Sequence, residues 1–156
     1  MVSDVLLDAH AWLHCRGQAL WTPEELSPSS IRTDVENGQY VLALVSDEAV
    51  GVVRFTWEDR LFWPEVVPAE AGYIHKLAVR RSYGGGQVSG EIIEWVAART
   101  MAAGRRLLRL DCDASRAKLR AVYERFGFMF HSEHTVGPYT VARYQKQLVG
   151  RAQVRA

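Results

Sequence analysis

The sequence has little of what marks secreted, membrane-bound or nucleic-acid-binding proteins. Its two cysteines, Cys15 and Cys112, are too few for a disulfide framework in 156 residues and are typical of a reducing cytoplasm. The formal net charge of +1 provides no field that would attract nucleic acid or an anionic membrane. The chain also lacks any apolar run that approaches the roughly 20 residues of a membrane span.

The N-terminal residues lack the basic segment and apolar core of a secretory signal, and they carry Asp4 and Asp8 instead. We therefore expect one cytoplasmic domain over residues 1–156, which is long enough to bury a core. Nucleic acids and membranes are not expected partners.

What the sequence does contain is an alternation of helix and strand patterns. Apolar spacing and capping signals predict helices at 4–16, 28–36, 88–102 and 115–126, the last with Ser115 as its cap, and a capping box at 22–26. Alternating apolar residues predict strands at 39–45, 50–57, 72–79, 105–112, 128–134 and 139–148. Residues 58–70 read as a loop with two prolines and exposed aromatic residues. The order predicts a mixed α/β domain with one central crossover unit.

Three consecutive glycines, Gly84–Gly86, lie between a strand pattern and a helix pattern. Glycine loses more conformational entropy on folding than other residues do. At the start of a helix, however, it lets an anion approach free N–H groups. A flexible turn explains the glycines equally well.

Two nucleotide motifs fit this stretch poorly. A Walker loop fails because Gln87-Val88-Ser89 contains no lysine. A dinucleotide fingerprint, with Asp111 or Asp113 as the ribose ligand, is a weak match because two arginines and a tyrosine separate the strand from the glycines.

A third interpretation rests on two longer stretches. YIHKLAVRRSYGGGQVSGEIIEWV (73–96) resembles the central motif of the GNAT N-acetyltransferases, a strand ending Leu-x-Val followed by a glycine loop that opens a helix. LDCDASRAKLRAVYERFGF (110–128) resembles the second signature of that family, a strand, a short helix bearing Tyr, then Gly-Phe. The resemblance, including the order of elements, covers residues 39–148.

The resemblance implies a mixed α/β, GNAT-like fold. Its central, mostly antiparallel sheet would be splayed at the cofactor site and flanked by helices, with the family's first strand missing or displaced. It also implies an acetyl-coenzyme A site. The residues that would bind the pantetheine arm are Leu77, Ala78 and Val79, with the Val79 N–H facing the thioester oxygen, and those that would hold the pyrophosphate are Gly84, Gly85, Gly86, Gln87, Val88 and Ser89.

The sequence departs from the family pattern at several of these positions. Gly84 replaces a Gln or Arg, Gln87 replaces a glycine, and Ser89 replaces a closing Gly or Ala. Gln87 must therefore tolerate whatever dihedral angles its site imposes. Arg116 stands where the family often has Asn, so it either removes a pantetheine hydrogen bond or adds a cation for a coenzyme phosphate.

Acetyl transfer to an amine requires a proton acceptor, because an alkyl ammonium titrates near pH ~10. His75 lies on the central strand where many family members carry a Glu; it is either this base or a structural histidine, and ordered water is a further acceptor. In a regular strand His75, Leu77 and Val79 share one face. Tyr123 matches the family's tyrosine near the coenzyme sulfur, although its spacing also fits a core aromatic.

Other polar and aromatic clusters carry less information. His10 and His14 have a spacing that binds metals, but no third ligand is evident, so we expect a solvated helix face and no metal site. Trp21, Phe62 and Trp63 fall in predicted loops, where an acceptor pocket, a homodimer contact and core anchoring all remain open.

The sequence thus predicts a cytoplasmic N-acetyltransferase that moves an acetyl group directly from acetyl-coenzyme A to the amine of a small molecule. A first alternative is a GNAT-fold module that binds acyl-coenzyme A without efficient catalysis, given the altered loop. A second alternative is a small dinucleotide-binding oxidoreductase.

Overall fold

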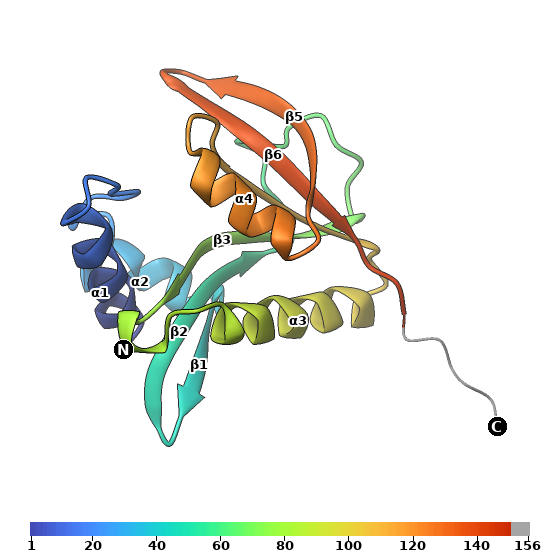
Figure 1. The fold of residues 1–156 in the computed structure, drawn as a ribbon. Coiled ribbons are helices and arrows are strands. Elements are labelled where there is room, and N and C mark those ends of the chain that lie inside the picture. Colours follow the sequence, from blue (N-terminus) through green and yellow to red (C-terminus); the bar gives the residue numbers. More distant parts are fainter. Residues whose placement is uncertain (151–156) are drawn as a thin grey trace. The chain divides into compact units, whose positions relative to one another are not determined.

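The structure is a computed structural model that describes residues 1–150, and Figure 1 shows its elements. In chain order they are α1 (Val2–His14), α2 (Pro28–Glu36), β1 (Tyr40–Val45), β2 (Glu48–Thr56), β3 (Ala71–Val79), a 3₁₀ turn η1 (Arg81–Tyr83), α3 (Gln87–Ala102), β4 (Leu107–Asp113), α4 (Ala117–Arg125), β5 (Met129–Val136) and β6 (Tyr139–Gln147). Within the described residues no strand precedes α1.

The six strands form one sheet in the order β1-β2-β3-β4-β6-β5. β3 and β4 are parallel, as the α3 crossover between them requires, whereas β1–β2, β4–β6 and β5–β6 are antiparallel. The predicted mixed α/β fold with a mostly antiparallel sheet is therefore confirmed. The predicted helices and strands are all present, with ends that differ by a few residues.

The chain divides into two compact units, each built from two stretches. The first, called the N-terminal unit, comprises Met1–Phe55 and His75–Glu94. The second, called the C-terminal unit, comprises Thr56–Ile74 and the chain from Trp95 onward. The division falls within β3, within α3 and before the last residue of β2, so each unit holds part of these three elements.

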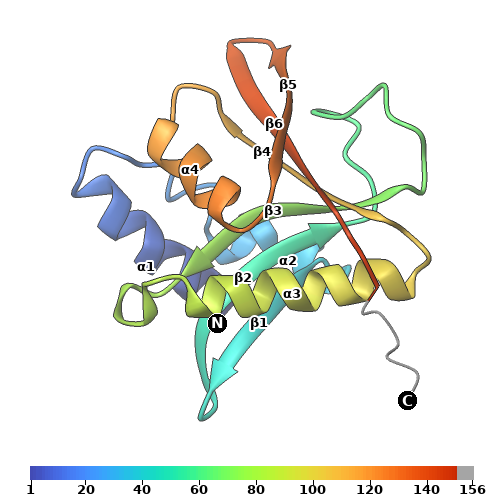
Figure 2. The same cartoon turned by 45° about the vertical axis from the view of Figure 1, so that its right-hand side comes forward.

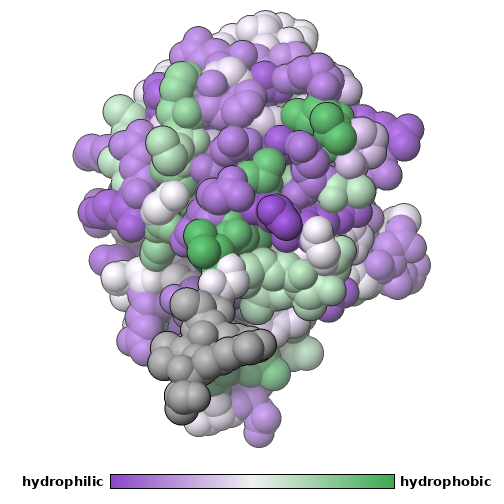
Figure 3. Space-filling model, turned by 90° about the vertical axis from the view of Figure 1, so that its right-hand side faces the viewer, coloured by the Kyte–Doolittle hydropathy of each residue, from purple (hydrophilic) through white to green (hydrophobic). Residues whose placement is uncertain are grey.

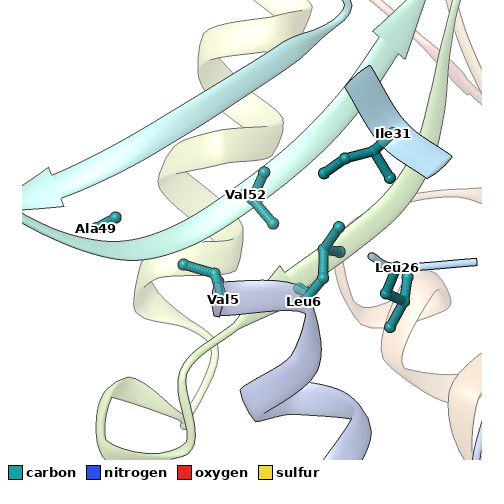
Figure 4. Close-up of a cluster of buried hydrophobic side chains, with 7 residues drawn as sticks. Val5, Leu6, Leu26, Ile31, Ala49 and Val52 are labelled. Carbon is teal, nitrogen blue, oxygen red and sulfur yellow. The ribbon is translucent and has the colours of Figure 1, made fainter. Parts of the chain in front are cut away.

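The N-terminal unit has its core where α1 and α2 pack against β2. Figure 4 shows this cluster of buried side chains, which comprises Val5, Leu6, Leu26, Ile31, Ala49, Val52 and Ala78. The two helices are positioned by polar contacts at their ends. Ser27 caps α2 by accepting a hydrogen bond from the Ser30 N–H, and the buried Ser3 hydroxyl on α1 donates to the Leu26 carbonyl.

The C-terminal unit is centred on a tryptophan held between two arginines. Trp63 is only 2% exposed, and the guanidinium carbons of Arg109 and Arg143 lie 5.0 and 4.8 Å from its ring centroid. Glu70 pairs with Arg109, and Glu65 pairs with Arg143, so both buried cations are compensated. The expectation of exposed aromatic residues in the 58–70 loop is therefore wrong for Trp63, which anchors this core.

Of the two capping expectations, the capping box is confirmed and the Ser115 cap is wrong. Thr22 and Glu25 exchange the two hydrogen bonds of a capping box, but residues 23–26 form a turn rather than a helix. Ser115 does not cap α4, because its N–H and hydroxyl both donate to the Asp113 carboxylate and α4 begins at Ala117.

On the face drawn in Figure 3, hydrophobic residues are scattered among hydrophilic ones. Among the described residues, no helix has the length and apolarity that a membrane crossing needs.

Gly51 on β2 allows the first half of α3 to approach the hairpin of β1 and β2 (Figure 2). A Cβ at Gly51 would lie 2.8 Å from Ile92 Cδ1 and 2.9 Å from Val88 Cγ1. Gly51→Ala should therefore lower the free energy of unfolding by about 1–3 kcal/mol through overpacking. Ile92→Val removes the nearer methyl group at a cost of about 0.5–1.5 kcal/mol.

Urea denaturation of both single variants and the double variant checks this contact. The double variant should lose less stability than the sum of the two single losses, because the two changes relieve each other. Strictly additive losses would show that Gly51 and Ile92 do not constrain one another.

Candidate active site

The pairing between β3 and β4 stops before either strand ends. The four residue pairs run from Ala71↔Leu107 to Ile74↔Leu110, yet β3 continues to Val79 and β4 to Asp113. Lys76, two residues past the last pair, has φ +45, a left-handed conformation that a non-glycine residue adopts at a cost of roughly 1–3 kcal/mol.

This interruption affects the residues expected to bind the coenzyme arm. Leu77, Ala78 and Val79 lie beyond the last β3–β4 pair, so their β4-directed backbone groups take no part in that ladder. Ala78 is 5% exposed and packs in the core of the N-terminal unit, whereas Leu77 and Val79 are half-buried. A regular strand would place His75, Leu77 and Val79 on one face. The positive φ of Lys76 interrupts that regular alternation.

The glycine loop presents backbone N–H groups at the start of α3. Gly85 and Gly86 have φ +120 and +100, so the loop reverses at these two residues, where side chains are strongly disfavoured. The first bond into the helix runs from the Gly90 N–H to the Gly86 carbonyl. The N–H groups of Gln87, Val88 and Ser89 therefore precede the helical ladder and have no acceptor within it.

These geometric features fit an anion. A Cβ built on Gly85 has no heavy atom within 4 Å, so the space beside its main chain is open. Successive N–H groups at a helix N-terminus favour negative charge. Gln87 lies within α3, not among the residues with positive φ, and its side-chain amide donates to Glu91, so the replacement of glycine at this position strains nothing.

Not every expected group of the loop is open to a ligand. The Gly84 N–H already donates to the Arg81 carbonyl at 3.0 Å, closing the 3₁₀ turn. Arg80 is engaged as well, because its side chain donates to the Ala49 carbonyl and lies 3.7 Å from Asp8. The Arg81 guanidinium stacks over Trp12 at 4.8 Å. The two arginines thus fasten the loop to α1 and β2.

Tyr123 lies on α4 in the C-terminal unit and is half-buried. Its ring meets Phe128 edge to face, with centroids 6.2 Å apart. Burial raises the pKa of Tyr123, and the nearby Cys112 and Asp111 raise it further. Tyr123 is therefore a neutral O–H donor at physiological pH, as a group that protonates or hydrogen-bonds a departing thiolate must be.

Arg116 sits at the N-cap of α4, with its backbone N–H donating to the Asp113 carbonyl. Its charge contributes to a lowered pKa of Asp113, after the hydrogen bonds from Ser115. Arg116 thus lies at the start of α4, where the resemblance places an Asn. These contacts do not indicate which part of a ligand Arg116 would bind.

The sequence did not predict that two carboxylates of the C-terminal unit, those of Asp59 and Asp111, lie close together. Carboxylate oxygens of Asp59 and Asp111 lie within 4.8 Å of each other. Burial, then Asp59, raises the pKa of Asp111 to about 7, while Arg143 partly opposes this. The sequence indicates Asp111 only as a ribose ligand of a dinucleotide site, because no local pattern pairs it with a residue as distant in the chain as Asp59.

Three further residues that the sequence analysis singled out, Trp21, His10 and His75, lie in different surroundings. Trp21 is half-buried in the N-terminal unit, and the Lys76 ammonium lies 5.4 Å from its ring centroid. His10 is 8% exposed, so the expected solvated face of α1 is wrong at this residue, and its Nδ1 is buried without a hydrogen-bond partner. His75 directly follows the last paired residue of β3 and is half-buried.

Comparison with known proteins places these features in a family. Residues 6–128 match the model of the acetyltransferase (GNAT) family. The curated protein "Uncharacterized N-acetyltransferase YesJ" of Bacillus subtilis (strain 168) is 26% identical over 136 residues, which are 83% of this chain and 75% of that protein.

Solved structures share the fold. A GNAT-family acetyltransferase from Listeria monocytogenes 4b F2365 superposes with a TM-score of 0.75 at 24% identity, covering 94% of this chain and 87% of that one. An aminoglycoside 6'-N-acetyltransferase complexed with coenzyme A has a TM-score of 0.63 at 15% identity, covering 95% and 93%. The family match spans most of the chain, including the interrupted ladder, the glycine loop and α4. The chain belongs to the GNAT acetyltransferase family.

Proposed function

We propose that this acyltransferase moves the acetyl group of acetyl-coenzyme A directly to the amine of a small molecule. The observation that carries the proposal is the run of N–H groups at the head of α3, beside a glycine whose α-carbon faces open space. A pyrophosphate matches this arrangement, because it supplies negative charge and acceptors without needing a cationic side chain. The coenzyme A complex of the aminoglycoside acetyltransferase supports the same ligand class for this fold.

In the proposed reaction, main-chain groups of Leu77–Val79 bind the pantetheine arm. The Val79 N–H polarises the thioester oxygen and stabilises the negative charge that develops there. Tyr123 donates its hydroxyl proton to the sulfur as the carbon–sulfur bond breaks. A base accepts a proton from the incoming ammonium; His75 and ordered water are the two candidates for this base.

The acceptor is proposed to be a small amine because the chain has a net charge of only +1 and no field for docking a polyanion or polycation. Release of free coenzyme A thiol in the presence of a panel of polyamines, aryl alkylamines and aminoglycosides tests the function. Acetyl-coenzyme A binding without amine-dependent thiol release would contradict it and favour the non-catalytic binding alternative.

Gly85→Val should weaken acetyl-coenzyme A binding at least tenfold, because a β-branched side chain would occupy the open space beside the N–H groups and strain the φ of +120. Calorimetric titration measures the affinity. Gly137→Val is the matched control, since Gly137 also has a positive φ and open space but lies in the β5–β6 turn. Equal affinities of the two variants for acetyl-coenzyme A would show that the loop is not part of the coenzyme site.

Tyr123→Phe keeps the ring against Phe128 and removes only the hydroxyl. If that hydroxyl meets the departing sulfur, kcat should fall by about 10–10³-fold while the affinity for acetyl-coenzyme A stays nearly constant. Tyr139→Phe, which changes a 66% exposed tyrosine on β6, serves as the control and should keep full turnover. A Tyr123→Phe enzyme with the parent kcat would leave Tyr123 a packing residue.

A further inference from the structure

Three arginines of the N-terminal unit share only two carboxylates. Arg80 Nη1 lies 3.7 Å from an oxygen of Asp8, and its Nε lies 3.9 Å from an oxygen of Glu48, so both carboxylates face the same guanidinium. Arg16 and Arg81 have exposed side chains, and neither forms an ion pair with any residue that the structure describes. Two positive charges are thus left without a counterion.

A tryptophan on α1 brings these two guanidiniums together. The guanidinium carbons of Arg16 and Arg81 lie 4.5 and 4.8 Å from the centroid of the Trp12 ring. The backbone N–H of Arg81 also donates to the Asp8 carboxylate at 3.1 Å, which holds the start of the 3₁₀ turn against α1. A guanidinium that stacks on an aromatic ring keeps the donors along its edge for an anion. The two cations are therefore positioned side chains that still have donors to offer.

The Arg81 guanidinium lies against the first glycine of the loop. A Cβ added to Gly84 would be 2.6 Å from Arg81 Nη1, so the guanidinium lies where the side chain of any other residue would begin. Beside Gly85, in contrast, the space is open. The N–H groups without a helical acceptor, those of residues 87–89, lie at the other end of the loop. The loop region therefore has two features that favour anions, arginines at its start and main-chain amides at its end.

Coenzyme A has two anionic groups that differ in the same way. Its pyrophosphate has one negative charge on each phosphate, and main-chain amides at a helix start are sufficient to bind such a group. The phosphate on the 3′ oxygen of its ribose is a monoester, with a charge of about −2 at neutral pH. Two guanidiniums match that charge, and each can donate paired hydrogen bonds to phosphate oxygens.

We propose that Arg16 and Arg81, stacked on Trp12, bind the 3′-phosphate of the coenzyme and make the protein selective for coenzyme A over 3′-dephospho-coenzyme A. The inference rests on the proposed use of acetyl-coenzyme A and assigns a group of the coenzyme that the amides of the loop do not bind. Arg80 has no part in this site, because two carboxylates already compensate its charge. The dephospho form binds more weakly because it leaves the other two cations without a counterion.

Calorimetric titration of the full chain with acetyl-coenzyme A and with acetyl-3′-dephospho-coenzyme A tests the inference without an acceptor amine. Physiological ionic strength screens charges that are more than about 8 Å apart. The parent should bind acetyl-coenzyme A about tenfold or more tightly than the dephospho form. Arg81→Gln should weaken acetyl-coenzyme A binding by about tenfold and leave binding of the dephospho form nearly unchanged. Arg16→Gln should act in the same direction, which tests the site even if Arg81→Gln does not fold.

Arg99→Gln is the matched control. Arg99 is also exposed and lies over a tryptophan, with its guanidinium carbon 5.5 Å from the centroid of the Trp95 ring, but it belongs to the last turn of α3. The variant loses the same charge and the same kind of stacking, so it should keep the parent's preference for acetyl-coenzyme A. Arg81→Lys keeps the charge but loses the planar edge of the guanidinium, and it should therefore keep only part of that preference.

Two results would overturn the inference and leave the proposed acetyl transfer intact. One is a parent that binds acetyl-coenzyme A and its dephospho form equally well. The other is an equal loss of affinity for both coenzymes in Arg81→Gln and Arg16→Gln, because the arginines would then act on the pyrophosphate or through their general charge. A parent that binds neither coenzyme would contradict the proposed function together with this inference.

Discussion

The interruption of the β3–β4 ladder is the constraint on which the proposed site depends. Two parallel strands normally pair along their common length, but here the register ends at Ile74↔Leu110 while both strands continue. The left-handed conformation of Lys76 turns β3 immediately afterwards. We propose that the backbone groups of Leu77–Val79, which lie beyond the last pair, bind the pantetheine arm, whose amide groups can pair with them.

Within each unit, identifiable contacts hold the segments next to that interruption. On the N-terminal unit, Arg80 and the buried cluster around Leu6 and Val52 fasten the end of β3 to α1 and β2. On the C-terminal unit, the stack of Arg109, Trp63 and Arg143 holds the loop after β2 against β4 and β6. A site built from main-chain groups needs such support, because its geometry comes from the backbone rather than from adjustable side chains.

Much of the fold was predictable because its signals are local. The alternation in β2 and the apolar spacing in α3 and α4 each act within a few residues, and the structure has these elements where the sequence placed them. The capping box at Thr22 shows the limit of that reasoning. Its hydrogen bonds form, but a turn and not a helix follows, because Ser27, five residues after Thr22, already caps α2.

The site was predictable only in part. The glycine loop was identified because contiguous residues carry its resemblance, and the structure gives Gly85 and Gly86 the positive φ values that explain their presence. Trp63 was misjudged as exposed, since its two arginine partners come from β4 and β6. The Asp59–Asp111 pair was missed for the same reason: the shift in Asp111 arises from burial and a residue distant in sequence, which no local pattern records.

The central claim is that backbone amides of the glycine loop and of β3 bind the coenzyme. Amide chemical shifts of nitrogen-15-labelled protein, followed by NMR during titration with coenzyme A, test it directly. The largest changes should fall on Gly85–Ser89 and Leu77–Val79, and NAD at the same concentration should not reproduce them. Shifts that leave both segments unchanged, or an equal response to NAD, would contradict the claim.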